Sequence, residues 1–242
     1  MRILITSHEP LDAGISGRAA HASAYGLAEA GHDVRVLGVD GNPAVEHEPN
    51  VRVVLCHTSD PRAPLRFGPP TFDGRAALPT PTGGTAGAGS AGGGATHFSA
   101  LTDRQLADYR DVLREEFDRQ IDLHDPTIVH CQHVWLFGHL ALEAGVPYVL
   151  SAYGDEFAAG RADPRYRRFM LEAAENAGRI LTHDAAASEG VAALVGELEG
   201  RVVPFPLPVA AALHSGRWWE RLPQLYRDVV VERFGRMPAD DQ

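Results

Sequence analysis

The sequence predicts an α/β protein with a Rossmann-like three-layer arrangement, in which a parallel sheet carries helices on both faces. The main observation is that short β-rich runs alternate with segments of helical periodicity. Twice, two such strands are joined by one helix, which makes a βαβ unit and implies parallel strands with a right-handed crossover. The first unit is Arg2–Thr6, residues 17–30 and Val34–Val39, and the second is Thr127–His130, Val134–Ala144 and Tyr148–Ser151.

The first helix is expected to begin near Gly17, with Ser16 as its N-cap, and to end before Gly31. Gly14 and Gly17 would let an anion approach the backbone, because a helix N-terminus offers free N–H groups and the positive end of the dipole. The alternative is that both are turn and packing glycines. The spacing G-I-S-G is not the G-x-G-x-x-G fingerprint, so a standard dinucleotide site is not predicted.

A segment rich in Pro, Gly, Thr and Ala follows the strand predicted at Val51–Leu55. Within it, residues 79–95 are of low complexity. Such a composition buries too little apolar surface to offset the entropy lost on ordering the chain. The sequence therefore predicts a disordered, glycine-rich insert at residues 79–95.

The second half of the chain returns to alternating helices and strands, so that residues 1–210 are expected to form one domain. Gly145 is placed to end the helix at Val134–Ala144 in a left-handed cap, and Asp184 to cap a later helix. The further predicted elements are Thr102–Gln120, Pro164–Ala177 and Ala185–Leu198 as helices, and Arg179–Thr182 and Arg201–Phe205 as strands.

Residues 211–242 are expected to supply a C-terminal amphipathic helix that packs back on the domain. Trp218 and Trp219 then cover either core surface or a face that a partner closes. Pro223 is compatible with a first helical turn. The residues predicted on the apolar side are Trp218, Leu222, Leu225, Val229 and Phe234.

Composition limits the possible functions. The 242-residue chain has a formal net charge of −10, which argues against the basic surface that non-specific nucleic-acid binding needs. No apolar run approaches the roughly 20 residues of a membrane-spanning helix. The two cysteines, Cys56 and Cys131, each follow a predicted strand and favour buried thiols in a reduced, cytoplasmic protein.

Polar residues follow two of the predicted strands. His130, Gln132 and His133 lie at the end of the first, and Tyr153 and the pair Asp155–Glu156 at the end of the second. Ligands of open α/β sheets bind in the crevice at the carboxyl ends of the strands, so this edge is the predicted site. The alternatives are a structural histidine for His130 or His133, and a simple helix start for the acidic pair.

Three stretches resemble the N-terminal, acceptor-side half of family-4-like glycosyltransferases of the GT-B fold. They are IVHCQH followed by an apolar helix and GVPYVLSAYGDEF, the glycine-loop phrase GISGRAAHASAYGLAEAGHDVRVLG, and RILTHDAAASEGVAALVGELEGRVVPFPLPV. The resemblance covers about residues 1–210 apart from the insert. It implies a retaining, metal-independent transferase with a nucleotide sugar as co-substrate and no other cofactor. Residues 211–242 are too few for the family's donor-binding domain and resemble its final helix.

The resemblance also assigns site residues. Tyr153 stands where the family has a histidine beside the acceptor, and Asp155 and Glu156 would orient the acceptor hydroxyl or act as base. A tyrosine with an ordinary pKa of about 10 is a poor base at neutral pH. The residues expected to face the cleft and bind substrate are His8, Gly14, Ser16, Gly17 and His133.

Two functions of different class follow. In the first, the chain is an acceptor-binding subunit that transfers sugar to a sugar-bearing acceptor together with a separate donor-domain protein. In the second, it is a non-catalytic carbohydrate-binding or scaffold protein that kept the fold. A nucleotide-binding Rossmann enzyme of another kind is a third, weaker alternative, because the dinucleotide fingerprint is absent.

Overall fold

The computed structural model describes residues 1–11, 14–40, 51–57, 98–196, 198–208 and 216–239. The predicted disordered insert at residues 79–95 lies outside the described residues. Within the described chain, no helix is both long and apolar enough to cross a membrane.

A seven-stranded sheet forms the middle layer of the described chain, and all of its neighbouring strands pair in parallel. The strand order is β3-β2-β1-β4-β5-β6-β7, so the direction of winding reverses between β1 and β4. This confirms the predicted parallel sheet. The strands are β1 Arg2–Ser7, β2 Asp33–Asp40, β3 Arg52–His57, β4 Ile128–Gln132, β5 Tyr148–Ala152, β6 Arg179–Thr182 and β7 Val202–Pro204.

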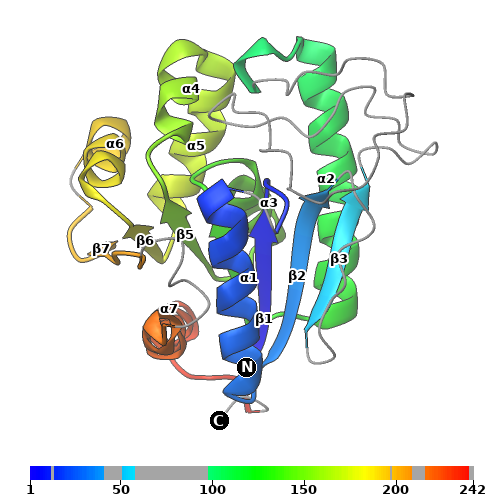
Figure 1. Cartoon of the computed structure of the whole chain (residues 1–242), viewed down its shortest axis with the longest axis vertical. Helices are drawn as coiled ribbons and strands as arrows, with labels where there is room; N and C mark the ends of the chain where they lie inside the picture. The colour runs from blue at the N-terminus through cyan, green and yellow to red at the C-terminus, as the bar shows by residue number, and fades with distance from the viewer. Residues whose placement is uncertain (12–13, 41–50, 58–97, 197, 209–215, 240–242) are drawn as a thin grey trace, which may run out of the picture.

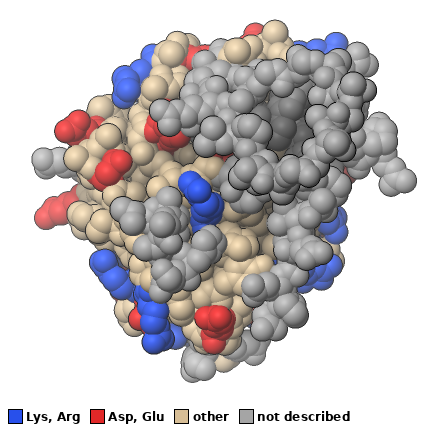
Figure 2. Space-filling model, viewed as in Figure 1, with Lys and Arg blue, Asp and Glu red and all other residues tan. Residues whose placement is uncertain are grey.

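Helices cover both faces of the sheet, as predicted (Figure 1). One apolar core joins α2, α3, α5 and α6 to one face, and a second joins α1 and α7 to the other. The helices are α1 Gly14–Glu29, α2 Asp103–His124, α3 Leu136–Ala144, α4 Glu156–Ala162, α5 Pro164–Asn176, α6 Ala185–Val195 and α7 Leu222–Phe234, with short 3-10 turns η1 Phe98–Ala100 and η3 Trp218–Arg221. On the face shown in Figure 2, acidic and basic side chains are scattered among one another rather than gathered in one patch.

Local signals set several helix ends as expected. Gly145 ends α3 with φ of 71°, and the Asp184 carboxylate accepts the Ala187 N–H at 2.7 Å to cap α6. The start of α1 was predicted wrongly, because the helix begins at Gly14 and includes Ser16 in its first turn. The Ser16 hydroxyl donates to the Glu9 carboxylate instead of capping the helix.

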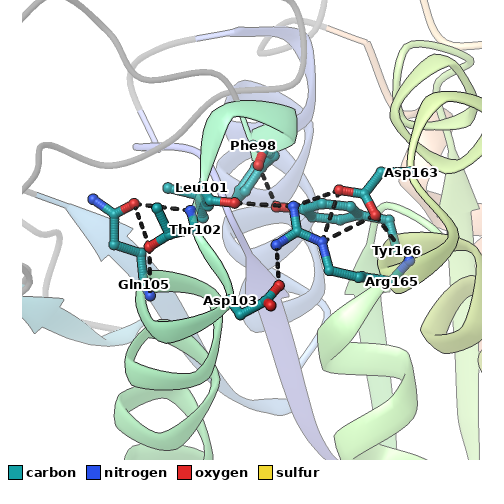
Figure 3. A network of polar contacts seen from close by, with 8 residues as sticks. All are labelled: Phe98, Leu101, Thr102, Asp103, Gln105, Asp163, Arg165 and Tyr166. Carbon is teal, nitrogen blue, oxygen red and sulfur yellow. Dashed lines mark hydrogen bonds and ion pairs between the residues drawn. The ribbon is translucent and has the colours of Figure 1, made fainter.

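A polar network centred on Arg165 fastens the start of α5 to the start of α2 (Figure 3). Its guanidinium donates to the Asp163 carboxylate, to Asp103 Oδ1 at 2.5 Å and to the Leu101 carbonyl at 2.9 Å. The same guanidinium holds the pKa of Asp163 below its usual value. Nearby, Tyr166 donates to the Phe98 carbonyl. Together these contacts hold the segment that leads into α2 against the α4–α5 corner.

One amphipathic helix was expected in the C-terminal segment, but the structure shows a 3-10 turn followed by an α-helix. The turn η3 precedes α7, and Pro223 lies in the first turn of α7, where a missing N–H costs nothing. The buried side of α7 consists of Leu222, Tyr226, Val229 and Val230. Phe234 is 55% exposed, so its predicted place on the apolar side was wrong. The buried stripe turns toward Tyr226 because its hydroxyl reaches His130 in β4 at 2.7 Å.

The two tryptophans of η3 are half-buried and pack against the core on the α1 side. Trp219 lies so close to Gly26 that a Cβ built on this glycine would be 2.1 Å from the indole Cε2. Trp219 thus covers core surface, which is the simpler of the two readings of the sequence.

This contact predicts that Gly26→Ala lowers the stability of the protein, although the same substitution inside a helix normally raises it. Alanine is normally better than glycine inside a helix by about 0.5–1 kcal/mol. Here the added methyl group overpacks against Trp219, and we expect a net loss of about 1–3 kcal/mol in the free energy of unfolding. Urea denaturation measures the change. In a Trp219→Ala background the same substitution is expected to be neutral or stabilising; a stabilising single variant would contradict the packing described here.

Candidate functional site

The candidate site lies at the carboxyl ends of the central strands, where the strand arrows of Figure 1 point toward α4. It sits beside the reversal of strand order between β1 and β4, which is where open α/β sheets bind ligands. The side chains that the fold brings together there lie at or just after the ends of β1, β4, β5 and β6: Glu9, Gln132, His133, Tyr153, Asp155 and His183.

Asp155 is the most accessible carboxylate among the predicted catalytic residues. It precedes α4 and accepts the Glu156 N–H at 3.0 Å as the helix N-cap. Its side chain is 34% exposed, and its Oδ1 is 3.7 Å from His133 Nε2. Asp155 therefore presents a charged oxygen to a ligand while its backbone position is fixed by α4.

Tyr153 is half-buried and its phenol is already engaged. The hydroxyl donates to Gln132 Oε1, and the ring centroid lies 4.6 Å from that of His183 and 5.1 Å from that of His133. Burial, followed by the negative charges of Glu9 and Glu156, raises the pKa of Tyr153 well above its ordinary value. The phenol stays protonated at neutral pH, so it can donate a hydrogen bond but cannot act as a base.

His133 adopts a backbone conformation that is uncommon for a non-glycine residue, with φ of 74°. Its N–H donates to the Ser151 carbonyl at 2.9 Å, which ties the loop after β4 to β5. The ring is almost fully buried and faces Asp155. One ligand atom each of Glu9, His133 and Asp155 lies within 4.8 Å of the other two.

Glu156, also predicted to be catalytic, is fully buried below this surface. Its carboxylate accepts N–H groups of Val134 at 3.3 Å, Tyr153 at 3.2 Å and Gly154 at 2.9 Å. Burial raises its pKa well above the ordinary value, with a further contribution from the neighbouring Asp155. These contacts give Glu156 a structural role that joins the loops after β4 and β5.

Two histidines near the site are buried in the core. His8 was expected to face the cleft; its Nδ1 instead meets the Tyr109 hydroxyl at 2.8 Å, and its ring lies against Phe137. Burial and then His133 lower the pKa of His8 well below its ordinary value. His130 hydrogen-bonds Tyr226 at 2.7 Å and Ser151 at 2.8 Å, as suits a structural residue.

The glycine loop is explained mainly by packing. A Cβ at Gly17 would lie 1.9 Å from the Pro10 carbonyl oxygen, and one at Gly14 would lie 2.1 Å from Glu9 Oε2. Gly14 also has φ of 62°, which favours glycine. Ser16 is buried against Glu9. The Glu9 carboxylate thus lies against the first turn of α1, where the sequence suggested an anion would bind.

Glu9 and His183 are the residues that sequence reasoning missed. Glu9 lies two residues after β1 and His183 comes directly after β6, so the same carboxyl-end rule that selected Asp155 would have found both. His183 donates its Nδ1–H to the Phe205 carbonyl at 2.7 Å, and burial lowers its pKa to about 4. Its imidazole is therefore neutral, and it lies tilted against the ring of Tyr153.

The family model of the glycosyl transferase 4-like domain matches residues 16–208, most of the chain. The chain belongs to this family. Comparison with curated protein sequences finds no match. The fold resembles two structures of sucrose-phosphate synthase from Thermosynechococcus elongatus, each with a TM-score of 0.55 and 13% identity. The alignment covers 93% of this chain and 97% of the first structure, and 86% of this chain and 48% of the second.

These similarities show the fold of the glycosyl transferase 4-like domain and, with the family match, the GT-B relationship. The chain spans about half of the second sucrose-phosphate synthase structure. Most of the polar residues described above follow strands inside the matched range, whereas His8 and Glu9 precede it.

The buried carboxylate of Glu156 leads to a stability prediction. Glu156→Ala leaves N–H groups of the loops after β4 and β5 without their acceptor. Each N–H that water does not reach then costs about 1–3 kcal/mol of folding free energy. We expect the free energy of unfolding to fall by at least about 2 kcal/mol, measured by urea denaturation. Glu115→Ala, at an exposed position of α2, serves as the control and should change stability by less than about 0.5 kcal/mol.

The buried histidines predict a loss of stability in acid. Burial lowers the pKa of His130 to about 3 and that of His183 to about 4. The unfolded chain therefore binds more protons below its ordinary histidine pKa of about 6.5, and each histidine costs up to about 1.4 kcal/mol per pH unit as pH falls. The effect is absent above about pH 7.

Urea titrations at several pH values between about 7 and 4.5 measure this slope. His130→Gln is expected to flatten it, since the variant has one fewer titrating group. An unchanged slope in the variant would show that His130 does not carry the acid sensitivity.

Proposed function

We propose that this chain is the acceptor-binding part of a glycosyltransferase that moves sugar from a nucleotide-activated donor to a sugar-bearing acceptor. The donor site belongs to a separate donor-binding domain or protein. The family match over residues 16–208 supports the transferase class. One sucrose-phosphate synthase structure is aligned over only 48% of its length, which is in keeping with a donor-binding part beyond the aligned region. We further propose that the reaction is cytoplasmic and that the nucleotide sugar is its co-substrate.

The observation that carries this proposal is the placement of Asp155. Its carboxylate is accessible, fixed by the N-terminus of α4 and 3.7 Å from His133, at the edge of the sheet where ligands bind. We assign Asp155 to orient the acceptor hydroxyl or to accept its proton. The half-buried ring of Tyr153 forms a wall for the acceptor, and Glu156 positions the loops.

A second function is favoured by one specific contact. The Tyr153 hydroxyl, at the position of the family's histidine, is bound to Gln132, and its raised pKa removes it as a base. A chain with this substitution can bind a carbohydrate without transferring it. The non-catalytic carbohydrate-binding protein is therefore the alternative.

Co-purification with the tagged chain from its native host, followed by transfer assays with the recovered partner, tests the proposal. We expect sugar transfer only when both components are mixed. Asp155→Asn keeps an N-cap side chain but removes the charge, and we expect transfer to fall at least about 100-fold. Asp228→Asn, which alters an exposed carboxylate of α7, should leave the rate unchanged.

The alternative gives a different result. If calorimetry detects acceptor binding by the chain but no mixture transfers sugar, the protein is a binding module. Equal transfer rates in Asp155→Asn and the unaltered protein would show that the Asp155 carboxylate does not take part in the reaction. The proposed acceptor site would then have lost the residue on which it depends.

A further inference from the structure

The centre of the candidate site contains a mixed set of ligand-type atoms from three different strand ends. Glu9 follows β1, His133 follows β4, and Asp155 follows β5. One oxygen or nitrogen of each lies within 4.8 Å of the other two, and His133 Nε2 is 3.7 Å from Asp155 Oδ1. Residues far apart in sequence thus direct one imidazole and two carboxylates to a common point.

We propose that Glu9, His133 and Asp155 bind a divalent transition-metal ion of the Mn²⁺ or Zn²⁺ type. Ligand atoms that lie about 2.0–2.2 Å from such an ion are about 3–4 Å from one another. The 3.7 Å between His133 Nε2 and Asp155 Oδ1 lies in that range, and the separations from Glu9 are at most 4.8 Å, so side-chain rotation would have to bring its oxygen closer. A ligand set of one imidazole and two carboxylates suits these metals better than it suits ions that prefer oxygen ligands alone. Three protein ligands also leave coordination positions open.

The charge of the site favours a cation. Among the described residues, no arginine forms an ion pair with Glu9, Asp155 or Glu156. Two of these carboxylates are buried. Buried carboxylates are normally paired or bound to metal, and a cation between Glu9 and Asp155 would give these two side chains such a partner.

The ligands are held in place by the protein itself. The Ser16 hydroxyl donates to Glu9, the N-terminus of α4 fixes Asp155, and the N–H of His133 is bound to the Ser151 carbonyl. Preorganisation of this kind lowers the cost of binding an ion.

A second group of one histidine and two carboxylates, centred on His139, does not have the geometry of a metal site. His139 directs Nε2 to Glu143 at 3.5 Å and Nδ1 to Glu172 at 3.1 Å, so its nitrogens point to separate carboxylates. Arg114 and Arg168 pair with those carboxylates. This group lacks a common point and its charge is compensated, which makes His139 a matched control.

The ion would also change the expected chemistry, because the family resemblance implied a metal-independent reaction. Its binding does not depend on the proposed function; only its role does. If the acceptor binds here, which rests on the proposed function, a metal held by these residues would take the acceptor hydroxyl at an open position and lower the pKa of that hydroxyl beside Asp155.

Metal binding is measured on the whole chain after treatment with a chelator. Mn²⁺ is titrated by electron paramagnetic resonance of the free ion, and Zn²⁺ by calorimetry, both without sugar present. We expect one saturable site. Glu9→Gln, which keeps an acceptor for Ser16, and Asp155→Asn should each weaken binding at least about 10-fold, since even residues that only support a ligand contribute that much. His139→Ala should bind as the unaltered protein does.

The inference is overturned if neither Mn²⁺ nor Zn²⁺ binds saturably. It is also overturned if Glu9→Gln and Asp155→Asn bind the ion with the same affinity as the unaltered protein. Folding of each variant is checked by circular dichroism. Acceptor binding measured in the presence of chelator reports separately on the proposed function, so failure of one proposal is distinguishable from failure of the other.

Discussion

The arrangement of the site depends on one buried carboxylate. Glu156 accepts N–H groups from both the loop after β4 and the loop after β5, and it is itself the first residue of α4. These loops carry His133 and Tyr153, and Asp155 is its immediate neighbour. A short, fully buried side chain thus ties three structural elements together, and the accessible groups around it take their positions from that connection.

A second connection links the C-terminal segment to the centre of the sheet. Tyr226 of α7 bonds to His130, and the other nitrogen of His130 bonds to Ser151 in β5. Ser151 also accepts the N–H of His133 through its carbonyl. The last helix therefore belongs to the same hydrogen-bonded chain as the candidate site. This explains why the apolar side of α7 is turned toward Tyr226 and leaves Phe234 exposed.

Much of the fold could be predicted because its signals are local: strand runs, Gly145, Asp184 and the βαβ alternation. The strand order and the burial of His8 depend on contacts between distant segments, which no local pattern encodes. Helix α4 was predicted only as an alternative, a helix start at the acidic pair, because it has only 7 residues and the same pair resembled catalytic carboxylates. Asp155 lies at the predicted edge of the sheet, with its side chain 34% exposed. The position of Glu9 after β1 could have been read from the sequence, but its contact with Ser16 and its place against Gly14 arise only after α1 has packed.

The glycines of α1 have a consequence for how the molecule can move. Near its start, Gly17 leaves no room for a side chain beneath the Pro10 carbonyl, and Gly26 leaves none beneath Trp219. These contacts are about 13 Å apart along a helix that rises 1.5 Å per residue. Close contacts at both points oppose sliding of α1 along its axis and rolling of α1 on the sheet. We therefore expect α1 to move together with the sheet as one body.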